Sequence, residues 1–145
     1  MNNRYICKAK RKDNGKWVEG YYVCLNENCH RIYTGYAEKD CGDYYPEYCE
    51  VIPETIRQCT GLKDKNGKLI FEGDILESRA SKNKEDWKKW VVTFSDGSFC
   101  FEREIPRKRK HKHEQNLLCI DEIELYGLIV IGNIHDDKEL LEVER

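Results

Sequence analysis

Cysteine and histidine are the first residues in this chain that could do chemistry, because thiolate and imidazole both bind zinc. Cys24, Cys29 and His30 lie close together, and Cys41 and Cys49 follow downstream. The spacing argues against zinc, since C-x4-C-H is followed by long gaps and the sequence contains no C-x2-C pair. The simpler interpretation is a set of scattered, partly buried thiols, so we predict no metal and no other cofactor.

Groups that could act as a general acid or base lie next to two predicted strands. Asp74 follows Gly73, and His135, Asp136 and Asp137 follow the last apolar run. Turn and cap roles explain these positions more simply, because Asp is common in turns and at helix N-termini. The sequence contains none of the motifs G-x-S-x-G, G-x-x-x-x-G-K-[ST], G-x-G-x-x-G or H-E-x-x-H. We therefore expect that the protein is not an enzyme.

A basic segment over 107–113 is the clearest charged feature, and its cations could neutralise several phosphates. Trp87 and Trp90 flank two further lysines, an arrangement that suits stacking on bases. The residues of this nucleic-acid hypothesis are Arg107, Lys108, Arg109, Lys110, Lys112, Lys88 and Trp90. The competing explanation is a solvated loop, or one that pairs with the acidic tail after residue 120.

Tyrosine is concentrated in the first part of the chain. The residues are Tyr21, Tyr22, Tyr33, Tyr36, Tyr44, Tyr45 and Tyr48. Tyrosine is favoured at protein interfaces because it joins a large apolar ring to a polar tip, although ordinary packing would also use it. We expect a homo-oligomer, since a small core gains from association. A different protein is the other candidate partner.

Short apolar and aromatic runs separated by turn residues must position these side chains. Asn14-Gly15, Asn66-Gly67 and Asp96-Gly97 each separate two such runs, which is typical of hairpins. We expect strands over 5–9, 17–23, 31–34, 48–52, 56–61, 69–71, 75–78, 90–94, 98–101 and 128–134. We expect irregular chain over 36–46, a charged loop over 103–116 and a last helical turn over 138–143. The segment 117–125 fits a strand and a short helix equally well.

Composition bounds the architecture that these elements can form. The 145 residues are 39% hydrophobic and 36% charged, which allows one domain or two small subdomains with a modest core. Many short strands predict a mainly β protein with β subdomains over 1–60 and 61–145, the second barrel-like. The sequence has neither an apolar run of membrane-spanning length nor an apolar signal core, so we expect a cytoplasmic protein with reduced cysteines and no membrane partner.

The segment 53–76, PETIRQCTGLKDKNGKLIFEGDIL, carries the strongest family signal. Together with VIGNIH over 130–135 and ELLE over 139–142, it resembles the YopX-like family of phage and prophage proteins. Two positions depart from the family pattern. Cys59 stands where an aromatic residue is usual, which implies a different local core contact. The segment 108–113 is also more basic than expected, so a charge-based function would be particular to this chain.

The resemblance implies a β-rich fold whose C-terminal half is a small SH3-like barrel, and an origin in a phage or prophage within a bacterial host. It implies no activity, and it carries over no catalytic residue. The turns of the 53–76 segment explain its glycines as parts of the fold. The resemblance therefore implies a phage or prophage accessory protein. The residues add the expectation of a non-enzymatic, oligomeric interaction protein, and a host or phage protein is the other candidate partner. The alternative is a nucleic-acid-binding regulator that uses the basic loop 107–113.

Overall fold

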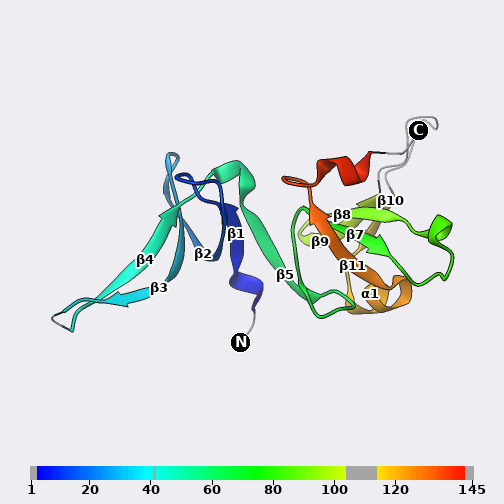
Figure 1. The fold of residues 1–145 in the computed structure, drawn as a ribbon, viewed down its shortest axis with the longest axis horizontal. Coiled ribbons are helices and arrows are strands. Elements are labelled where there is room, and N and C mark those ends of the chain that lie inside the picture. The colour runs from blue at the N-terminus through cyan, green and yellow to red at the C-terminus, as the bar shows by residue number, and fades with distance from the viewer. Residues whose placement is uncertain (1–2, 41, 104–113, 143–145) are drawn as a thin grey trace. The chain divides into compact units, whose positions relative to one another are not determined.

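The structure is a computed structural model of the 145-residue chain, and it describes residues 3–40, 42–103 and 114–142. Its described residues form two antiparallel sheets and one short α-helix (Figure 1). The predicted mainly β fold is therefore confirmed. The chain divides into two compact units, Met1–Cys59 and Thr60–Arg145. None of the described helices is long and apolar enough to cross a membrane.

The first unit contains a meander of four strands, with a short 3₁₀ turn on each side of it. The first sheet has the strand order β4-β3-β2-β1-β5-β6, and β5 is the strand along which the chain passes from one unit to the next. The elements are η1 (Asn3–Tyr5), β1 (Cys7–Lys10), β2 (Trp17–Asn26), β3 (Cys29–Glu38), β4 (Tyr44–Glu50), η2 (Pro53–Thr55), β5 (Arg57–Lys63) and β6 (Leu69–Phe71).

Local turn chemistry and a small core hold the meander together. The first hairpin closes as predicted: Asn14 Oδ1 accepts a hydrogen bond from Lys16 N at 2.9 Å, and Gly15 has a φ of +69°. Such a left-handed φ costs glycine little. The core of the unit consists of Ala9, Ile32 and Val51, with Cys7, Val18, Tyr22 and Ile56 packed against them.

The expectation of irregular chain over 36–46 is wrong for most of that segment. Strand β3 continues to Glu38, and β4 begins at Tyr44. The register shifts between Tyr33 and Gly35, and beyond this bulge the described pairs of β3 are with β4 alone. The outer half of the β3–β4 hairpin is therefore two-stranded, and it extends past the other strands of its unit (Figure 1).

The second unit contains a five-stranded antiparallel sheet with the order β10-β9-β8-β7-β11. The sheet has two edge strands and is open in the described residues, so closure into an SH3-like barrel stays a prediction. Its elements are β7 (Asp74–Ser78), η3 (Lys84–Asp86), β8 (Lys89–Ser95), β9 (Ser98–Arg103), β10 (Glu114–Leu117), α1 (Ile120–Tyr126), β11 (Leu128–Asn133) and η4 (Lys138–Leu141).

Several local expectations for the second unit can now be compared with the structure. Asp96 and Gly97, with φ of 51° and 80°, form the predicted two-residue turn between β8 and β9. Most of the ambiguous segment 117–125 belongs to helix α1. Gly127 has a left-handed conformation and ends this helix. The expected loop over 103–116 is wrong at its end, where β10 pairs with β9. The predicted last helical turn is confirmed as η4.

The core of the second unit lies on one face of its sheet. It consists of Ile70, Leu76, Trp90, Val92, Phe101, Leu118, Ile123 and Leu128. Cys59, the departure from the family pattern, is also fully buried, as a small apolar side chain would be.

Candidate functional site

The residues considered for zinc have structural partners instead. Cys24 lies opposite His30 in the β2–β3 register, whereas Cys29 is the neighbour of His30 on β3 and so points to the other face. His30 Nδ1 is 2.7 Å from the Tyr22 hydroxyl, and His30 Nε2 is 3.1 Å from the Glu27 carbonyl. Within the described residues, no three His, Cys, Asp or Glu side chains are grouped so that they could hold a metal.

The Tyr22–His30 pair belongs to the packing of the first unit. The two rings stack with centroids 6.0 Å apart, next to the core residue Ile32. Burial raises the pKa of the Tyr22 hydroxyl, and the neighbouring Cys24 raises it further. The Tyr22 phenol is therefore expected to be neutral near neutral pH, and the stacked His30 ring is a packing residue.

The aspartates considered as acids or bases hold the backbone in place. Asp74 is buried, and its Oδ2 accepts a hydrogen bond from Phe71 N at 2.8 Å. Asp137 precedes η4 but gives it no side-chain cap, so the expected capping of that turn is wrong. Asp137 Oδ2 instead accepts a hydrogen bond from Asn133 N at 3.0 Å, at the end of β11. Asp136 Oδ2 lies 3.3 Å from Asn133 Nδ2.

Asp64 is a structural carboxylate that the sequence reasoning missed. Its Oδ1 accepts hydrogen bonds from Asn66 N and Lys68 N, and its Oδ2 accepts one from Val130 N. The aspartate two residues before Asn66-Gly67 was the available signal, because Asp often bonds the backbone of its own turn. Only the hydrogen bond from Val130 on β11 could not be inferred from the sequence, because it depends on how distant parts of the chain fold together.

The basic residues of the nucleic-acid hypothesis are divided by the structure. The loop 107–113, with Arg107, Lys108, Arg109, Lys110 and Lys112, lies outside the described residues. Lys88 is exposed. Trp90 is 5% exposed, and its ring packs against Phe101 and Tyr126 with centroids 5.5 and 5.9 Å apart. The Trp90 ring is therefore part of the core and offers no surface for stacking on a base.

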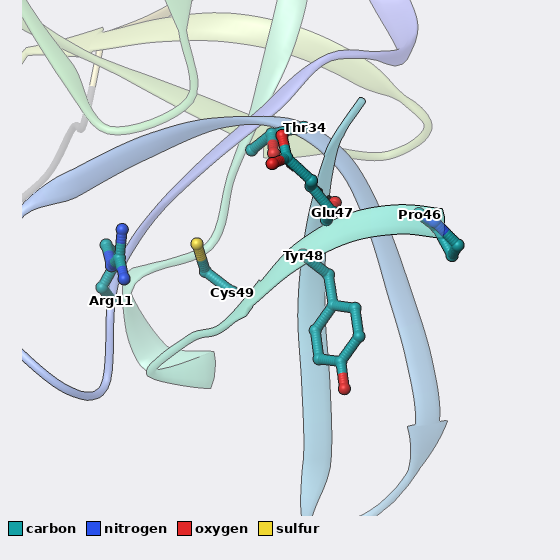
Figure 2. Close-up of a pocket in the computed structure, with 6 residues that line it drawn as sticks. All are labelled: Arg11, Thr34, Pro46, Glu47, Tyr48 and Cys49. Atoms are coloured by element: carbon teal, nitrogen blue, oxygen red, sulfur yellow. Dashed lines mark hydrogen bonds between the residues drawn. The ribbon is translucent and has the colours of Figure 1, made fainter. Parts of the chain in front are cut away.

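A shallow hollow lies beside the edge strand β4, and Figure 2 shows its lining. Its volume is about 410 Å³, and it is lined by Arg11, Thr34, Pro46, Glu47, Tyr48 and Cys49. Arg11 is already paired, since its Nε and Nη2 donate to Asp13 at 2.9 and 2.7 Å. No histidine is among these lining residues, so the Cys49 thiol lacks the base that a nucleophile needs there.

The side chains of β4 alternate between the two sides of the sheet, so the Tyr48 ring points away from the side of Cys49 although Tyr48 is one of the lining residues. In Figure 2 the Cys49 and Glu47 side chains point to one side, and the Tyr48 ring and Pro46 point to the opposite side. Tyr48 lies opposite Tyr33 in the register, and Tyr33 lies opposite Tyr21. Residues in register share a face of a sheet, so the three rings form a row across three strands.

The same face continues onto the outer half of the hairpin. Beyond the bulge, Tyr36 lies opposite Pro46 and Glu38 lies opposite Tyr44. Because Pro46 and Tyr44 alternate with Tyr48 along β4, these residues also lie on the side of the row. We name this surface the tyrosine face and define it by Tyr21, Tyr33, Tyr36, Tyr44 and Tyr48. Tyr22 and Tyr45 point to the other side.

The rings of the tyrosine face are exposed to an unusual degree for aromatic side chains on a sheet. Tyr21, Tyr36, Tyr44 and Tyr48 are 52%, 74%, 66% and 45% exposed. The Tyr33 and Tyr48 ring centroids are 5.3 Å apart. Contiguous exposed aromatic surface of this kind marks interaction sites on protein surfaces.

Arg31 is the cation at the centre of this face, and carboxylates surround it. Its guanidinium lies 4.1 Å from the centroid of the Tyr48 ring, and a hydrogen bond with Tyr33 raises its pKa. Glu50 lies opposite Arg31 in the register, and strand alternation places Glu19 and Glu38 on the same side. Two of these carboxylates also have lysines near them, since Lys8 Nζ is 3.5 Å from Glu19 Oε2 and Lys12 Nζ is 3.9 Å from Glu50 Oε2. The tyrosine face is thus aromatic, with one stacked arginine and largely paired carboxylates.

Fold and surface together define a class: a two-unit, mainly antiparallel β protein that displays an aromatic sheet face. The model of the family described as "YopX protein" matches residues 8–142. The chain therefore belongs to the YopX family, as the resemblance of the 53–76 segment predicted.

The comparison with solved structures agrees with this assignment. The chain is similar to the structure described as "Crystal structure of protein EF1440 from Enterococcus faecalis", with 29% sequence identity and a TM-score of 0.62. The similarity covers 94% of this chain and 96% of that chain, so it spans both units. No curated protein matches the chain.

Proposed function

We propose that this YopX-family chain is a non-enzymatic interaction protein of phage or prophage origin, and that it works in the cytoplasm of a bacterial host. It docks onto a protein partner through the tyrosine face. The observation that supports this proposal is the row Tyr21, Tyr33 and Tyr48 with Arg31 stacked on it. Tyrosine and arginine are the residues that most often dominate binding energy at protein interfaces.

The charges on the tyrosine face favour a protein partner over nucleic acid. Arg31 is accompanied on that side by Glu19, Glu38 and Glu50. Binding to nucleic acid draws on several cations that neutralise phosphates. Near this face Lys8 Nζ already lies 3.5 Å from Glu19 Oε2, and Lys12 Nζ lies 3.9 Å from Glu50 Oε2. Exposed tyrosines beside a single arginine suit an apolar protein surface with a polar rim.

Site-specific photo-crosslinking in producing cells tests the proposal. A photoreactive aromatic amino acid replaces Tyr36 or Tyr48 in the face, or Tyr5 as the control. Tyr5 is 66% exposed but lies on η1, outside the face. We expect protein adducts of defined mass from the two face positions and none from position 5. The absence of adducts at Tyr36 and Tyr48, or equal adducts at all three positions, would overturn the proposal.

Binding to nucleic acid is a second candidate function, and it would use the second unit. The segment 79–89 carries four exposed lysines, Lys82, Lys84, Lys88 and Lys89, and the basic loop 107–113 follows in the sequence. The SH3-like barrel predicted for this unit fits such a role, since small β-barrels often bind nucleic acid. Neutralising the five basic residues of the loop should abolish any binding to DNA or RNA, and that binding should fall steeply with salt. Binding that salt does not weaken would contradict this candidate.

A further inference from the structure

We infer that the partner of the tyrosine face is the same face of a second copy, so that two first units pack sheet against sheet about a twofold axis. This inference rests on the proposed function and names the partner of that surface. Most soluble oligomers are symmetric, and a twofold interface needs a patch that is complementary to itself. The tyrosine face meets this condition because its exposed rings can pack against the same rings of a second copy.

The outer edge of the sheet is a poor alternative for the contact between copies. Strand β4 is the edge strand, and Pro46 within it has no N–H to donate to a neighbouring strand. Glu47 is the middle residue of β4, so antiparallel pairing of two copies about that residue would place like charges opposite each other. Proline and charged residues are the usual means of blocking edge pairing. Contact through the tyrosine face is therefore the arrangement of two copies that we infer.

The exposed rings supply more than half of the area that a standard dimer interface buries. A tyrosine side chain has about 150–250 Å² to bury, so five half-exposed rings provide on the order of 500 Å² for each copy. A standard interface buries about 800 Å² for each partner. Val23, which lies on this side and is 37% exposed, and Pro46 add apolar surface next to the rings. Packed sheets lie about 10 Å apart, which is the distance that interdigitating rings fill.

The charges of the face do not oppose contact between two copies, because its carboxylates have cations close to them within each copy. Lys8 Nζ lies 3.5 Å from Glu19 Oε2, and Lys12 Nζ lies 3.9 Å from Glu50 Oε2. The Arg31 guanidinium lies over the Tyr48 ring. Arg31 Nε is buried without a hydrogen-bond partner among the described residues, so the chain leaves part of the donor capacity of this guanidinium unused.

Sedimentation equilibrium of the full chain at roughly 1–100 µM tests the inference. We expect a monomer–dimer equilibrium for the natural sequence. The double variant Tyr36→Ser/Tyr44→Ser should dimerise at least about tenfold more weakly, because both rings are lost from the interface. The control Tyr5→Ser should dimerise normally. A natural chain that stays monomeric over this range, or equal weakening by Tyr5→Ser, would overturn the inference.

A charge exchange provides a second test that does not depend on the tyrosines. Arg31→Glu adds a third carboxylate between Glu19 and Glu50, and Glu19→Lys/Glu50→Lys adds two cations beside Arg31, Lys8 and Lys12, so each variant should repel its own copies. An equal mixture of the two should form a one-to-one heterodimer, and no other partner predicts this recovery. Failure of the mixture to dimerise, with both variants folded by circular dichroism, counts against the inference.

Failure of this inference can be told apart from failure of the proposed function. If the purified chain is monomeric while Tyr36 and Tyr48 crosslink to a different protein in cells, the second copy is excluded and the interaction role stands. If neither dimer nor crosslink forms, both are overturned. Crosslinks with twice the mass of the chain, together with dimerisation of the purified protein, support both.

Discussion

Asp64 accepts hydrogen bonds from the backbone N–H groups of Asn66, Lys68 and Val130 at 2.8, 2.9 and 2.9 Å. Asp64 is 6% exposed, whereas Asn66 and Lys68 are exposed residues and Val130 is half-buried. A hydrogen bond to a charged group contributes about 1.5–3 kcal/mol, and a buried donor left without a partner costs a similar amount.

Replacement of Asp64 should therefore be strongly destabilising. We expect Asp64→Ala to lower the free energy of unfolding by about 3–5 kcal/mol, because it removes a buried carboxylate that accepts three backbone hydrogen bonds. Urea denaturation followed by circular dichroism measures the change. Glu124→Ala, which removes an exposed carboxylate from α1, is the control and should change stability by less than about 0.5 kcal/mol. Equal losses in the two variants would contradict the role assigned to Asp64.

Gly132 lies where β11 shifts register, next to Asp137. A Cβ added to Gly132 would lie 2.6 Å from Asp137 Oδ2 and 2.8 Å from Asp137 Cβ. The glycine thus permits the close approach that lets Asp137 bond the Asn133 N–H group. A side chain at this position would displace that carboxylate.

We expect Gly132→Ala to destabilise the protein by about 1–3 kcal/mol through this overlap. Thermal denaturation measures the effect. The same substitution in an Asp137→Gly background is the matched control, since the overlapping atoms are then gone and the added cost should shrink. Additive costs in the double variant would show that the overlap is not the cause.

The turn between β1 and β2 is an element whose stability should depend on pH. Two hydrogen bonds from Arg11 to Asp13 lower the pKa of the carboxyl group and raise the pKa of the guanidinium. A carboxyl group whose pKa is lower in the folded state stabilises the fold above its unfolded pKa. That contribution disappears as the pH falls through the folded pKa.

An NMR titration of the Asp13 carboxyl carbon tests this prediction. In the natural chain the midpoint should lie below that of an unstructured aspartate, and in Arg11→Gln it should move back towards that value. The effect on overall stability should be small, because both side chains are largely exposed to solvent. An unchanged midpoint in Arg11→Gln would contradict the assigned cause.

Elements whose structure is decided within a few residues could be predicted from the sequence. Asn14-Gly15 and Asp96-Gly97 specify their turns locally, and both are formed. The outer part of the β3–β4 hairpin could not be predicted, because Asp- and Gly-rich sequence is typical of loops and only pairing with Tyr44–Glu50 makes it a strand.

The candidate surface shows the same division between local and long-range information. The sequence indicated that tyrosines gather in the first part of the chain and that they could form an interface. It could not indicate which of them share a face, because that depends on the register across three strands and on the bulge after Tyr33. The prediction that the Trp90 ring could stack on a base was wrong. Trp90 and Val92 are two residues apart on β8, a spacing that is typical of side chains facing a core.

At the scale of the whole molecule, the chain has two cores that share no residue. Ile32 belongs to the core of the first unit, and Phe101 belongs to that of the second. The residues of each core therefore pack against residues of the same core. A cavity in one core should be felt mainly in the unit that contains it.

We expect Phe101→Ala to cost about 3–5 kcal/mol, as loss of a fully buried ring does. Hydrogen exchange should then accelerate across β7, β8 and β9, whereas amides in β2 and β3 keep their protection. Ile32→Ala is the reciprocal variant, for which the pattern should reverse. Loss of protection in both units after either change would show that they unfold as one body.

The bond between Asp64 and Val130 also has a consequence for synthesis on the ribosome. The two residues are 66 positions apart, so Asp64 leaves the exit tunnel long before the strand that supplies its third donor has been translated. The first unit finds its core residues within the first 59 residues and can fold while the rest is being made. The second unit has to wait for β11. A nascent chain that stalls before residue 128 would carry one folded unit and one unfinished one.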